Sequence, residues 1–192
     1  MLAKGNKGQE VKEHQDDVIA LGFGEYLGKH GADSHFGKLT HLATEKTQKW
    51  LGIKVDGIVG PQTRKAVDQA KKQAGLKGTN NFNIDEFRCS DNGEMLKSGM
   101  DSELVLNLEV LRYELGNKPV TINSGYRTPS YNKVVGGAAN SQHLYGKATD
   151  IVVDDVRPGI VQKHANDLFA NGGLGHYNTF THVDTRGYRA RW

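Results

Sequence analysis

The sequence lacks the features that would place it in several common protein classes. Its 192 residues contain a single cysteine, Cys89, so an intramolecular disulfide and a multi-cysteine metal site are both excluded. No apolar run approaches the roughly 20 residues that a transmembrane helix needs. Met1 to Asn6 begin no apolar stretch of the signal-peptide type, so we expect no export through the general secretion route.

The sequence also has no basic run with interleaved aromatic residues. A hydrophobic content of 36% and a charged content of 24% are typical of an ordinary soluble protein. The net charge of +3 arises in residues 1–78, where 13 Lys and Arg face 9 Asp and Glu, whereas residues 79–192 hold 12 against 13. A modest positive charge favours an anionic polymer such as a cell wall or nucleic acid. We expect a monomer without nucleic-acid or membrane partners.

Residues 33–44 and 56–67 form an internal repeat at an offset of 23. Each copy has an acidic residue that opens a turn, an apolar residue, a glycine, and a threonine that can cap a helix. The second copy continues with small and apolar residues at the i, i+3, i+4, i+7 spacing of one helix face. Together with an earlier apolar pattern from Val11 to Leu21, this predicts a small all-α bundle over residues 1–75.

Residues 76–81 lose the apolar period and end in Gly, Thr and Asn, which predicts a linker. The second domain is then residues 82–192. A leucine stripe predicts a helix from Asp101 to Leu115, and a second helix is expected at about 161–170. Short β-branched or aromatic segments predict strands at 120–122, 151–153 and 180–183. Helices mixed with such strands indicate an α+β domain with an antiparallel sheet.

His143, Asp150 and His182 are the candidate metal ligands of this second domain. Neutral imidazole nitrogens and a carboxylate oxygen suit a borderline-soft divalent ion such as Zn²⁺. Three protein ligands leave a fourth position for water or substrate, which is typical of a catalytic rather than a structural zinc site.

The same residues lie in a compound pattern, Ser-x-His-x-x-Gly-x-Ala-x-Asp, with His-x-Asp downstream and Ser-Gly-Tyr-Arg upstream at 124–127. This pattern resembles the M15 family of zinc peptidases, which includes D,D-carboxypeptidases and the L-Ala-D-Glu peptidases of phage endolysins. The resemblance covers roughly residues 80–192. It implies one zinc ion held by His143, Asp150 and His182, and cleavage at D-Ala-D-Ala, at L-Ala-D-Glu or at a crosslink.

The residues that would assist catalysis are less clearly marked. Arg127 could hold a substrate carboxylate or the oxygen of a tetrahedral intermediate. Many M15 members carry a proton acceptor two or three residues before the last ligand, but Thr179 and Phe180 occupy those positions here. Asp184 shares a strand face with the last ligand, so it is either the general base or a partner that orients that ligand. His176 is the second candidate base.

Two residues directly before the first ligand, Ser141 and Gln142, are expected to bind substrate together with Arg127. In the first domain, Val55 to Thr63 looks like the repeat of a peptidoglycan-binding domain that accompanies cell-wall hydrolases. Read without the resemblance, the same segment is only a turn followed by a helix with proline at its first position.

The combined pattern predicts an endolysin-like peptidoglycan hydrolase, in which zinc-activated water cleaves an amide of the wall's peptide stem. One alternative is a bacterial autolysin or D,D-carboxypeptidase. Another is a metal-containing wall-binding module without turnover, as the family's resemblance to the hedgehog signalling domain allows.

Overall fold

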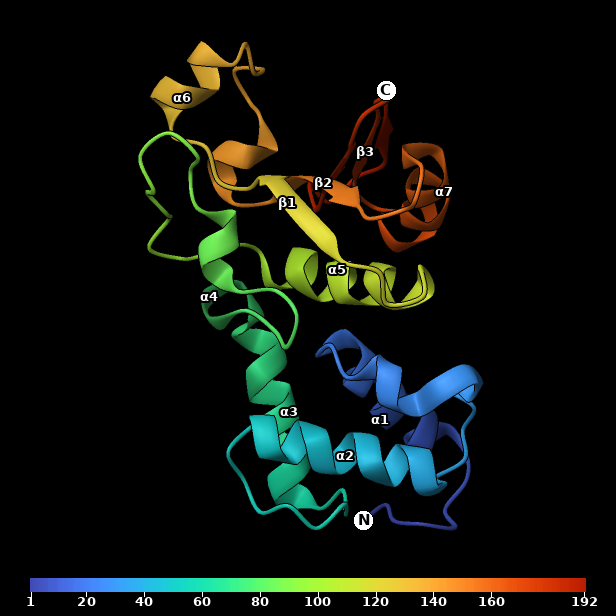
Figure 1. Cartoon of the computed structure of the whole chain (residues 1–192). Helices are drawn as coiled ribbons and strands as arrows, with labels where there is room; N and C mark the ends of the chain where they lie inside the picture. Colours follow the sequence, from blue (N-terminus) through green and yellow to red (C-terminus); the bar gives the residue numbers. More distant parts are fainter.

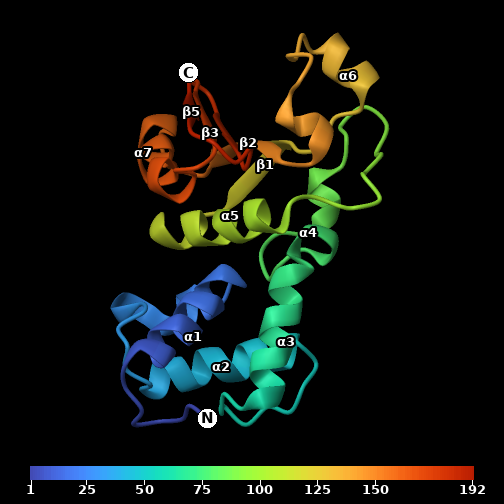
Figure 2. The ribbon, with the colours of Figure 1, turned by 180° about the vertical axis from the view of Figure 1, so that it is seen from behind.

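The computed structural model describes all 192 residues. Figure 1 shows the helices of the N-terminal half at one end of the molecule and a sheet with its flanking helices at the other. Helix α5 (Ser102–Glu114) crosses the middle, and the view from behind in Figure 2 again places it between the sheet and α1. The expected fold class, an all-α bundle followed by an α+β domain, is confirmed. None of the helices combines the length and apolarity that a bilayer span requires.

The N-terminal half consists of short helices joined by turns. Gly60 caps α3 and Pro61 is its first residue, where the missing N–H would have no helical partner in any case. The elements are α1 (Gln9–Ala20), the 3-10 segment η1 (Gly24–His30), α2 (Lys38–Trp50), α3 (Pro61–Lys72) and the short α4 (Ala74–Lys77).

The sequence repeat corresponds to two equivalent turns, and a buried glutamine closes each of them. In the first, the Gln15 amide donates to Asp33 Oδ1 and to Thr40 Oγ1, both at 2.9 Å. Its oxygen accepts from the Ser34 N–H at 2.9 Å. The side chain is only 1% exposed, so these contacts satisfy an amide that would otherwise be costly to bury.

In the second turn Gln48 makes the matching contacts. Its amide donates to Asp56 Oδ1 at 3.0 Å and to Thr63 Oγ1 at 3.1 Å. Its oxygen accepts from the backbone N–H groups of Asp56 at 3.0 Å and Gly57 at 2.8 Å. The acidic residue and the threonine of the sequence repeat are therefore the two side chains that bind the glutamine.

The C-terminal half contains a five-stranded sheet with helices on one face and loops on the other. Strand order is β1-β2-β4-β3-β5; the neighbouring strands are antiparallel except for β3 and β5, which are parallel. The elements after α4 are η2 (Ile84–Phe87), α5 (Ser102–Glu114), β1 (Val120–Ser124), α6 (Pro129–Val134), η3 (Gln142–Tyr145), β2 (Ala148–Val153), α7 (Pro158–Leu168), β3 (Gly173–His176), β4 (Thr181–Asp184) and β5 (Ala190–Arg191).

Helix α5 is shared by two hydrophobic cores. Leu104 and Leu108 are fully buried in the core of the C-terminal half, together with Ile151 of β2. Val110 and Tyr113 on another face of the helix pack against the core of the N-terminal half. A helix that is apolar on two faces is expected where it lies between two packed layers.

Residues 76–81, which composition predicts to be a linker, make contacts with both halves. Thr79 Oγ1 donates to Glu109 Oε1 on α5 at 2.6 Å, and the Asn81 N–H donates to the same oxygen at 2.9 Å. The Asn81 amide also donates to the Gly22 carbonyl oxygen at 2.9 Å, next to α1. Glu109 is 1% exposed. Burial raises the pKa of Glu109, and these donated hydrogen bonds act against that rise.

Candidate metal centre and its cleft

The structure brings the three predicted ligands together. Each of His143, Asp150 and His182 is buried and offers one ligand atom, and these atoms lie within 4.8 Å of one another. His143 Nε2 is 3.3 Å from His182 Nδ1, and His182 Nδ1 is 2.8 Å from Asp150 Oδ1. The third side of the triangle, from His143 Nε2 to Asp150 Oδ1, measures 3.4 Å.

Strand pairing brings two of the three ligands together, and a hydrogen bond to a loop carbonyl oxygen holds the third. Asp150 on β2 is the direct partner of His182 on β4, so both side chains project from the same face of the sheet. His143 comes from η3, outside the sheet. Its Nδ1 donates to the Gly125 carbonyl oxygen at 2.6 Å, and its own carbonyl oxygen accepts from the Arg127 N–H at 3.2 Å.

The spacing of the three atoms fits a tetrahedral zinc site. Bonds of about 2.0–2.1 Å place neighbouring ligands roughly 3.3 Å apart at the corners of a tetrahedron. The separations of 3.3 and 3.4 Å match this edge, and the one of 2.8 Å is somewhat shorter. Two nitrogens and one oxygen fill three corners, which leaves the fourth corner for water or substrate.

The hydrogen bonds on the far side of each ring fix which nitrogen can bind a cation. A carbonyl oxygen only accepts, so His143 Nδ1 carries the proton and Nε2 presents its lone pair. His182 Nε2 lies 3.1 Å from Asp184 Oδ2 and donates to it, which leaves Nδ1 as the ligand atom. The two lone pairs face each other, an arrangement that a bound cation stabilises.

The electrostatics of the site favour positive charge at its centre. Burial lowers the pKa of His143, which keeps this imidazole in its neutral, ligating form. Burial also acts to lower the pKa of His182, but the neighbouring carboxylates of Asp150 and Asp184 outweigh burial and raise that pKa. Burial acts to raise the pKa of Asp150, yet the two imidazoles beside it hold that pKa well below the usual range.

Arg127 forms an ion pair with the Asp150 carboxylate from outside the metal centre. Its Nη2 is 2.5 Å from Asp150 Oδ2, and its Nε donates to Ser124 Oγ at 2.8 Å. This ion pair occupies one carboxylate oxygen and leaves Oδ1 directed at the two imidazoles. Arg127 Nη1 makes no hydrogen bond within the protein, although the side chain lines the cleft.

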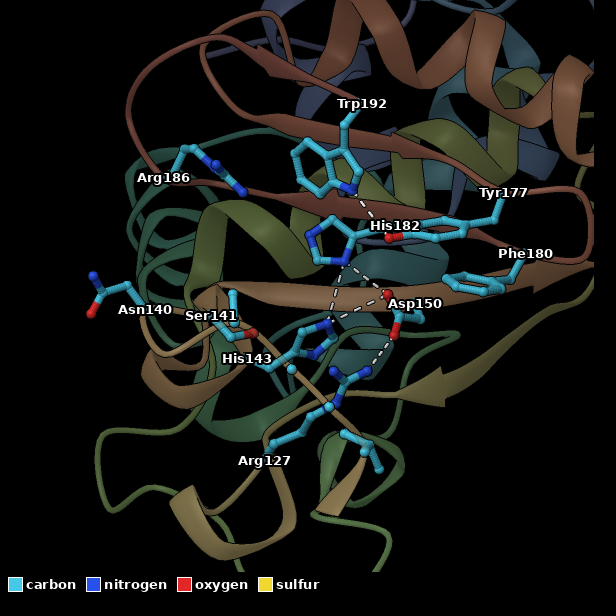
Figure 3. A pocket seen from close by; sticks show the side chains of 14 residues that line it. Arg127, Asn140, Ser141, His143, Asp150, Tyr177, Phe180, His182, Arg186 and Trp192 are labelled. Carbon is cyan, nitrogen blue, oxygen red and sulfur yellow. Dashed lines mark hydrogen bonds and ion pairs between the residues drawn. The ribbon is translucent and has the colours of Figure 1, made fainter. Parts of the chain in front are cut away.

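A cleft of about 520 Å³ opens over the three ligands. Figure 3 shows the ligands at its floor, Arg127 on one side, and the aromatic side chains of Tyr177, Phe180 and Trp192 on the other. The loop between α6 and η3 forms a further wall. Of the two residues expected to bind substrate with Arg127, Ser141 lines this cleft and Gln142 does not.

Asp184 lies behind the His182 ring rather than in the cleft. It is fully buried, and its carboxylate accepts hydrogen bonds from the Gly173 N–H at 2.8 Å and from Arg186 Nη2 at 2.6 Å. Burial alone would raise its pKa, but the hydrogen bonds with His182 and Arg186 keep that pKa well below the usual range. A carboxylate held in this state is a weak proton acceptor. The geometry favours the orienting alternative for Asp184 over the general-base alternative.

His176 is not brought to the metal centre. It pairs in register with Thr181, the neighbour of His182 on β4, and so belongs to the opposite face of the sheet from the ligand. The side chain is exposed, and its Nδ1 donates to the Trp192 carbonyl oxygen at 3.2 Å. This placement gives no support to His176 as the general base.

Nine of the 14 residues that line the cleft were not expected from the sequence, among them Tyr177, Phe180, Arg186 and Trp192. Arg186 follows Asp184 at a spacing of two, which was the one local signal that it could act on the same side. Trp192 lies ten residues after His182, and only the parallel pairing of β5 with β3 returns it to the site. Its ring centre is 5.2 Å from that of His182.

Comparison with known proteins agrees with this site. A 32% identity over 158 residues links the chain to the zinc D-Ala-D-Ala carboxypeptidase of Streptomyces albus G, covering 78% of this chain and 60% of the relative. A probable N-acetylmuramoyl-L-alanine amidase of Bacillus licheniformis is 32% identical over 152 residues, covering 78% of this chain and 41% of that protein. The amidase CwlL of the same organism is 46% identical over 67 residues, covering 35% and 18%.

The chain thus spans less than two thirds of the length of these relatives. Two families match adjacent parts of it. Residues 7–67 match the family described as putative peptidoglycan binding domain. Residues 80–184, which include all three metal ligands, match the family described as Peptidase M15. The chain therefore belongs to the peptidase M15 family.

Proposed function

We propose that this chain is a zinc peptidase that hydrolyses an amide bond in the peptide stem of peptidoglycan. The observation that supports this most is the triangle of His143, Asp150 and His182 donor atoms. The edges of this triangle fit a tetrahedral zinc site, and a cleft opens over the three residues. The matched family and the named activities of the relatives agree with this assignment.

A zinc ion held there would polarise the scissile carbonyl and activate a water molecule. The surrounding residues hold the ligands and receive the substrate. Arg127 keeps one oxygen of Asp150 occupied. Its unpaired Nη1 is the guanidinium nitrogen that is available to donate to a substrate oxygen. Asp184 and Arg186 fix the orientation of His182 from behind.

The direct test uses defined stem peptides and the purified protein. We expect about one zinc ion per chain, cleavage that stops with a chelator, and recovery when zinc is restored. Mass spectrometry of the products identifies which bond is cut. A protein that holds zinc in this site yet cleaves neither stem peptides nor intact walls would support the competing function, a wall-binding module without turnover.

For the N-terminal half, residues 1–75, we propose binding to the polymer of the wall. The support is the match of residues 7–67 to a putative peptidoglycan binding domain and the basic excess of residues 1–78. The test is sedimentation of the His143→Ala variant of the 192-residue chain with insoluble peptidoglycan, so that cleavage does not remove the ligand. We expect the protein in the pellet, and its recovery in the supernatant would contradict the proposal. The endolysin-like use, the monomeric state and the lack of nucleic-acid and membrane partners stay predictions.

A further inference from the structure

The metal ligands belong to a row of residues that crosses the sheet. Ser124 on β1 is the register partner of Asp150, Asp150 of His182, and His182 of Gly175 on β3. All four positions face the cleft side of the sheet. At one end of the row Arg127 is bonded to Ser124. The other end, at Gly175, carries no side chain.

Two aromatic side chains fill the space above Gly175. A Cβ atom added there would lie 2.8 Å from Tyr177 Cε2 and 2.9 Å from Trp192 Nε1, closer than real Cβ contacts. Tyr177 and Trp192 therefore occupy the position beside His182 that a side chain at Gly175 would otherwise take. Figure 3 shows the Tyr177 ring extending over the floor of the cleft toward His182 and Asp150.

Three contacts fix the orientation of the Tyr177 hydroxyl. Trp192 Nε1 donates a hydrogen bond to the Tyr177 oxygen at 3.1 Å. The Tyr177 ring stacks on Phe180 with a centroid distance of 4.2 Å and an interplanar angle of 13°. The Trp192 backbone is in turn held by β3, because the His176 N–H donates to the Trp192 carbonyl oxygen at 2.7 Å.

The hydroxyl proton of Tyr177 has no acceptor within the protein. Its oxygen already accepts from Trp192, so the proton is the free part of a group whose ring is held in place. Two of the other charged groups that line the cleft are engaged. Asp150 is bound by the two imidazoles and Arg127, and Arg186 is bound to Asp184 at 2.6 Å. Tyr177 is thus an oriented hydrogen-bond donor at the end of the ligand row opposite Arg127.

We propose that Tyr177 is a catalytic residue. Its hydroxyl donates a hydrogen bond to the carbonyl oxygen of the scissile amide as that oxygen gains negative charge, and Trp192 is the positioning residue that directs it. This inference rests on the proposed peptidase function. A donor fixed before the reaction stabilises developing charge without the cost of reorganising water.

The first test is Tyr177→Phe, which keeps the ring and its stacking on Phe180 and removes only the hydroxyl. We expect kcat on a soluble stem peptide to fall about 10²–10³-fold, the effect of losing one oxyanion donor, with zinc content unchanged. Tyr145→Phe removes a hydroxyl from an exposed tyrosine outside the cleft and should behave as wild type. A Tyr177→Phe variant with wild-type kcat overturns the proposal.

A second readout does not depend on turnover. A phosphinate analogue of the stem dipeptide carries a tetrahedral, negatively charged group, and calorimetry measures its affinity. We expect Tyr177→Phe to weaken binding of this analogue much more than binding of the product peptide, which has no tetrahedral group. An equal loss for both ligands would assign Tyr177 to general substrate binding and would overturn the catalytic role.

The third test addresses Trp192. Trp192→Phe removes the Nε1 donor, and we expect a smaller loss of kcat in the same direction. In the double variant with Tyr177→Phe, the two losses should not add, because Trp192 acts through the Tyr177 hydroxyl. Fully additive losses would overturn the positioning role. Wild-type protein that holds zinc but cleaves no stem peptide would contradict the proposed function instead, so the two failures are distinguishable.

Discussion

Two regions of this molecule bury polar side chains to a similar extent but differ in whether those groups satisfy one another. In the N-terminal half, the amides of Gln15 and Gln48 donate and accept hydrogen bonds entirely within their own turns. In the C-terminal half, two buried imidazole lone pairs and one carboxylate oxygen point at a common centre. The first kind of cluster is complete in itself, and the second presents its donor atoms to a cation.

The difference separates polar groups that stabilise the fold from polar groups that are kept for chemistry. A buried amide with all its partners contributes modestly to stability, and removing it is costly because its partners stay buried. Lone pairs that face each other do not stabilise the fold by themselves. Their geometry is maintained by Gly125, Asp184 and Arg127, which hold the ligands from outside. We therefore expect substitutions in the two clusters to have opposite consequences.

The largest effect is expected when the metal centre loses a ligand. In His143→Ala and His182→Ala only two of the three donors remain, so zinc content should fall sharply and wall lysis should fall about 10³-fold or more, because a bound metal supplies several kcal/mol of transition-state stabilisation. Elemental analysis and loss of wall turbidity are the measurements. Stability of the zinc-free proteins should change little. Full zinc occupancy in both variants would contradict the assigned ligands.

The next largest effect is expected when the hydrogen-bonded cluster around Gln48 loses its glutamine amide. Gln48→Met keeps the length of the side chain but leaves the N–H groups of Asp56 and Gly57 without their acceptor. At about 1–3 kcal/mol for each buried unpaired group, we expect the free energy of unfolding to fall by about 4 kcal/mol. Urea denaturation measures this. Gln69→Met, on the exposed face of α3, is the matched control and should change little. A Gln48→Met protein that also loses its zinc would remove the contrast between the two regions.

A third effect concerns the stability of the folded protein at acidic pH. His14 is buried against Phe36 and donates to Thr44 Oγ1 at 2.9 Å, and burial lowers its pKa to about 4. Between pH 6.5 and 4 the unfolded chain binds this proton and the folded chain does not, so stability falls as the pH falls, by about 3 kcal/mol in all. Urea denaturation across this range should show a shallower pH dependence for His14→Gln. The same slope in both proteins would contradict the assignment.

The residues that the sequence predicts well are those that repeat or occur in a compound motif. His143, Asp150 and His182 belong to a compound motif that resembles the M15 family, and this resemblance implies their role as ligands. The turns at 33–44 and 56–67 follow from the spacing of the repeat. Their partners cannot. Gln15 precedes its turn by 18 residues and Gln48 precedes its own by eight, so the two glutamines do not follow the offset of 23.

Sheet register and burial decide the remaining positions. Trp192 reaches the cleft only through a parallel pairing of β5 with β3, and the space for it exists because Gly175 is the register partner of His182. Composition marks residues 76–81 as a linker, whereas Thr79 and Asn81 bind the buried Glu109 carboxylate. In each case the decisive partner is far away in sequence.

The smallest effect, and the one that distinguishes the two roles of Asp184, is expected from Asp184→Asn. As the partner that orients His182, Asp184 supports the ligand and the charge of the centre. Its replacement should weaken zinc binding about 10–100-fold while kcat at saturating zinc stays near wild type. A general base would give the reverse, a loss of turnover of about 10²–10⁴-fold with zinc retained. Competition with a chelating dye measures the affinity, and Asp155→Asn, at a side chain that is 86% exposed, is the control. Asp184 is fully buried behind the His182 ring and already bound by Arg186. We therefore expect the first result, a weaker affinity for zinc with turnover retained.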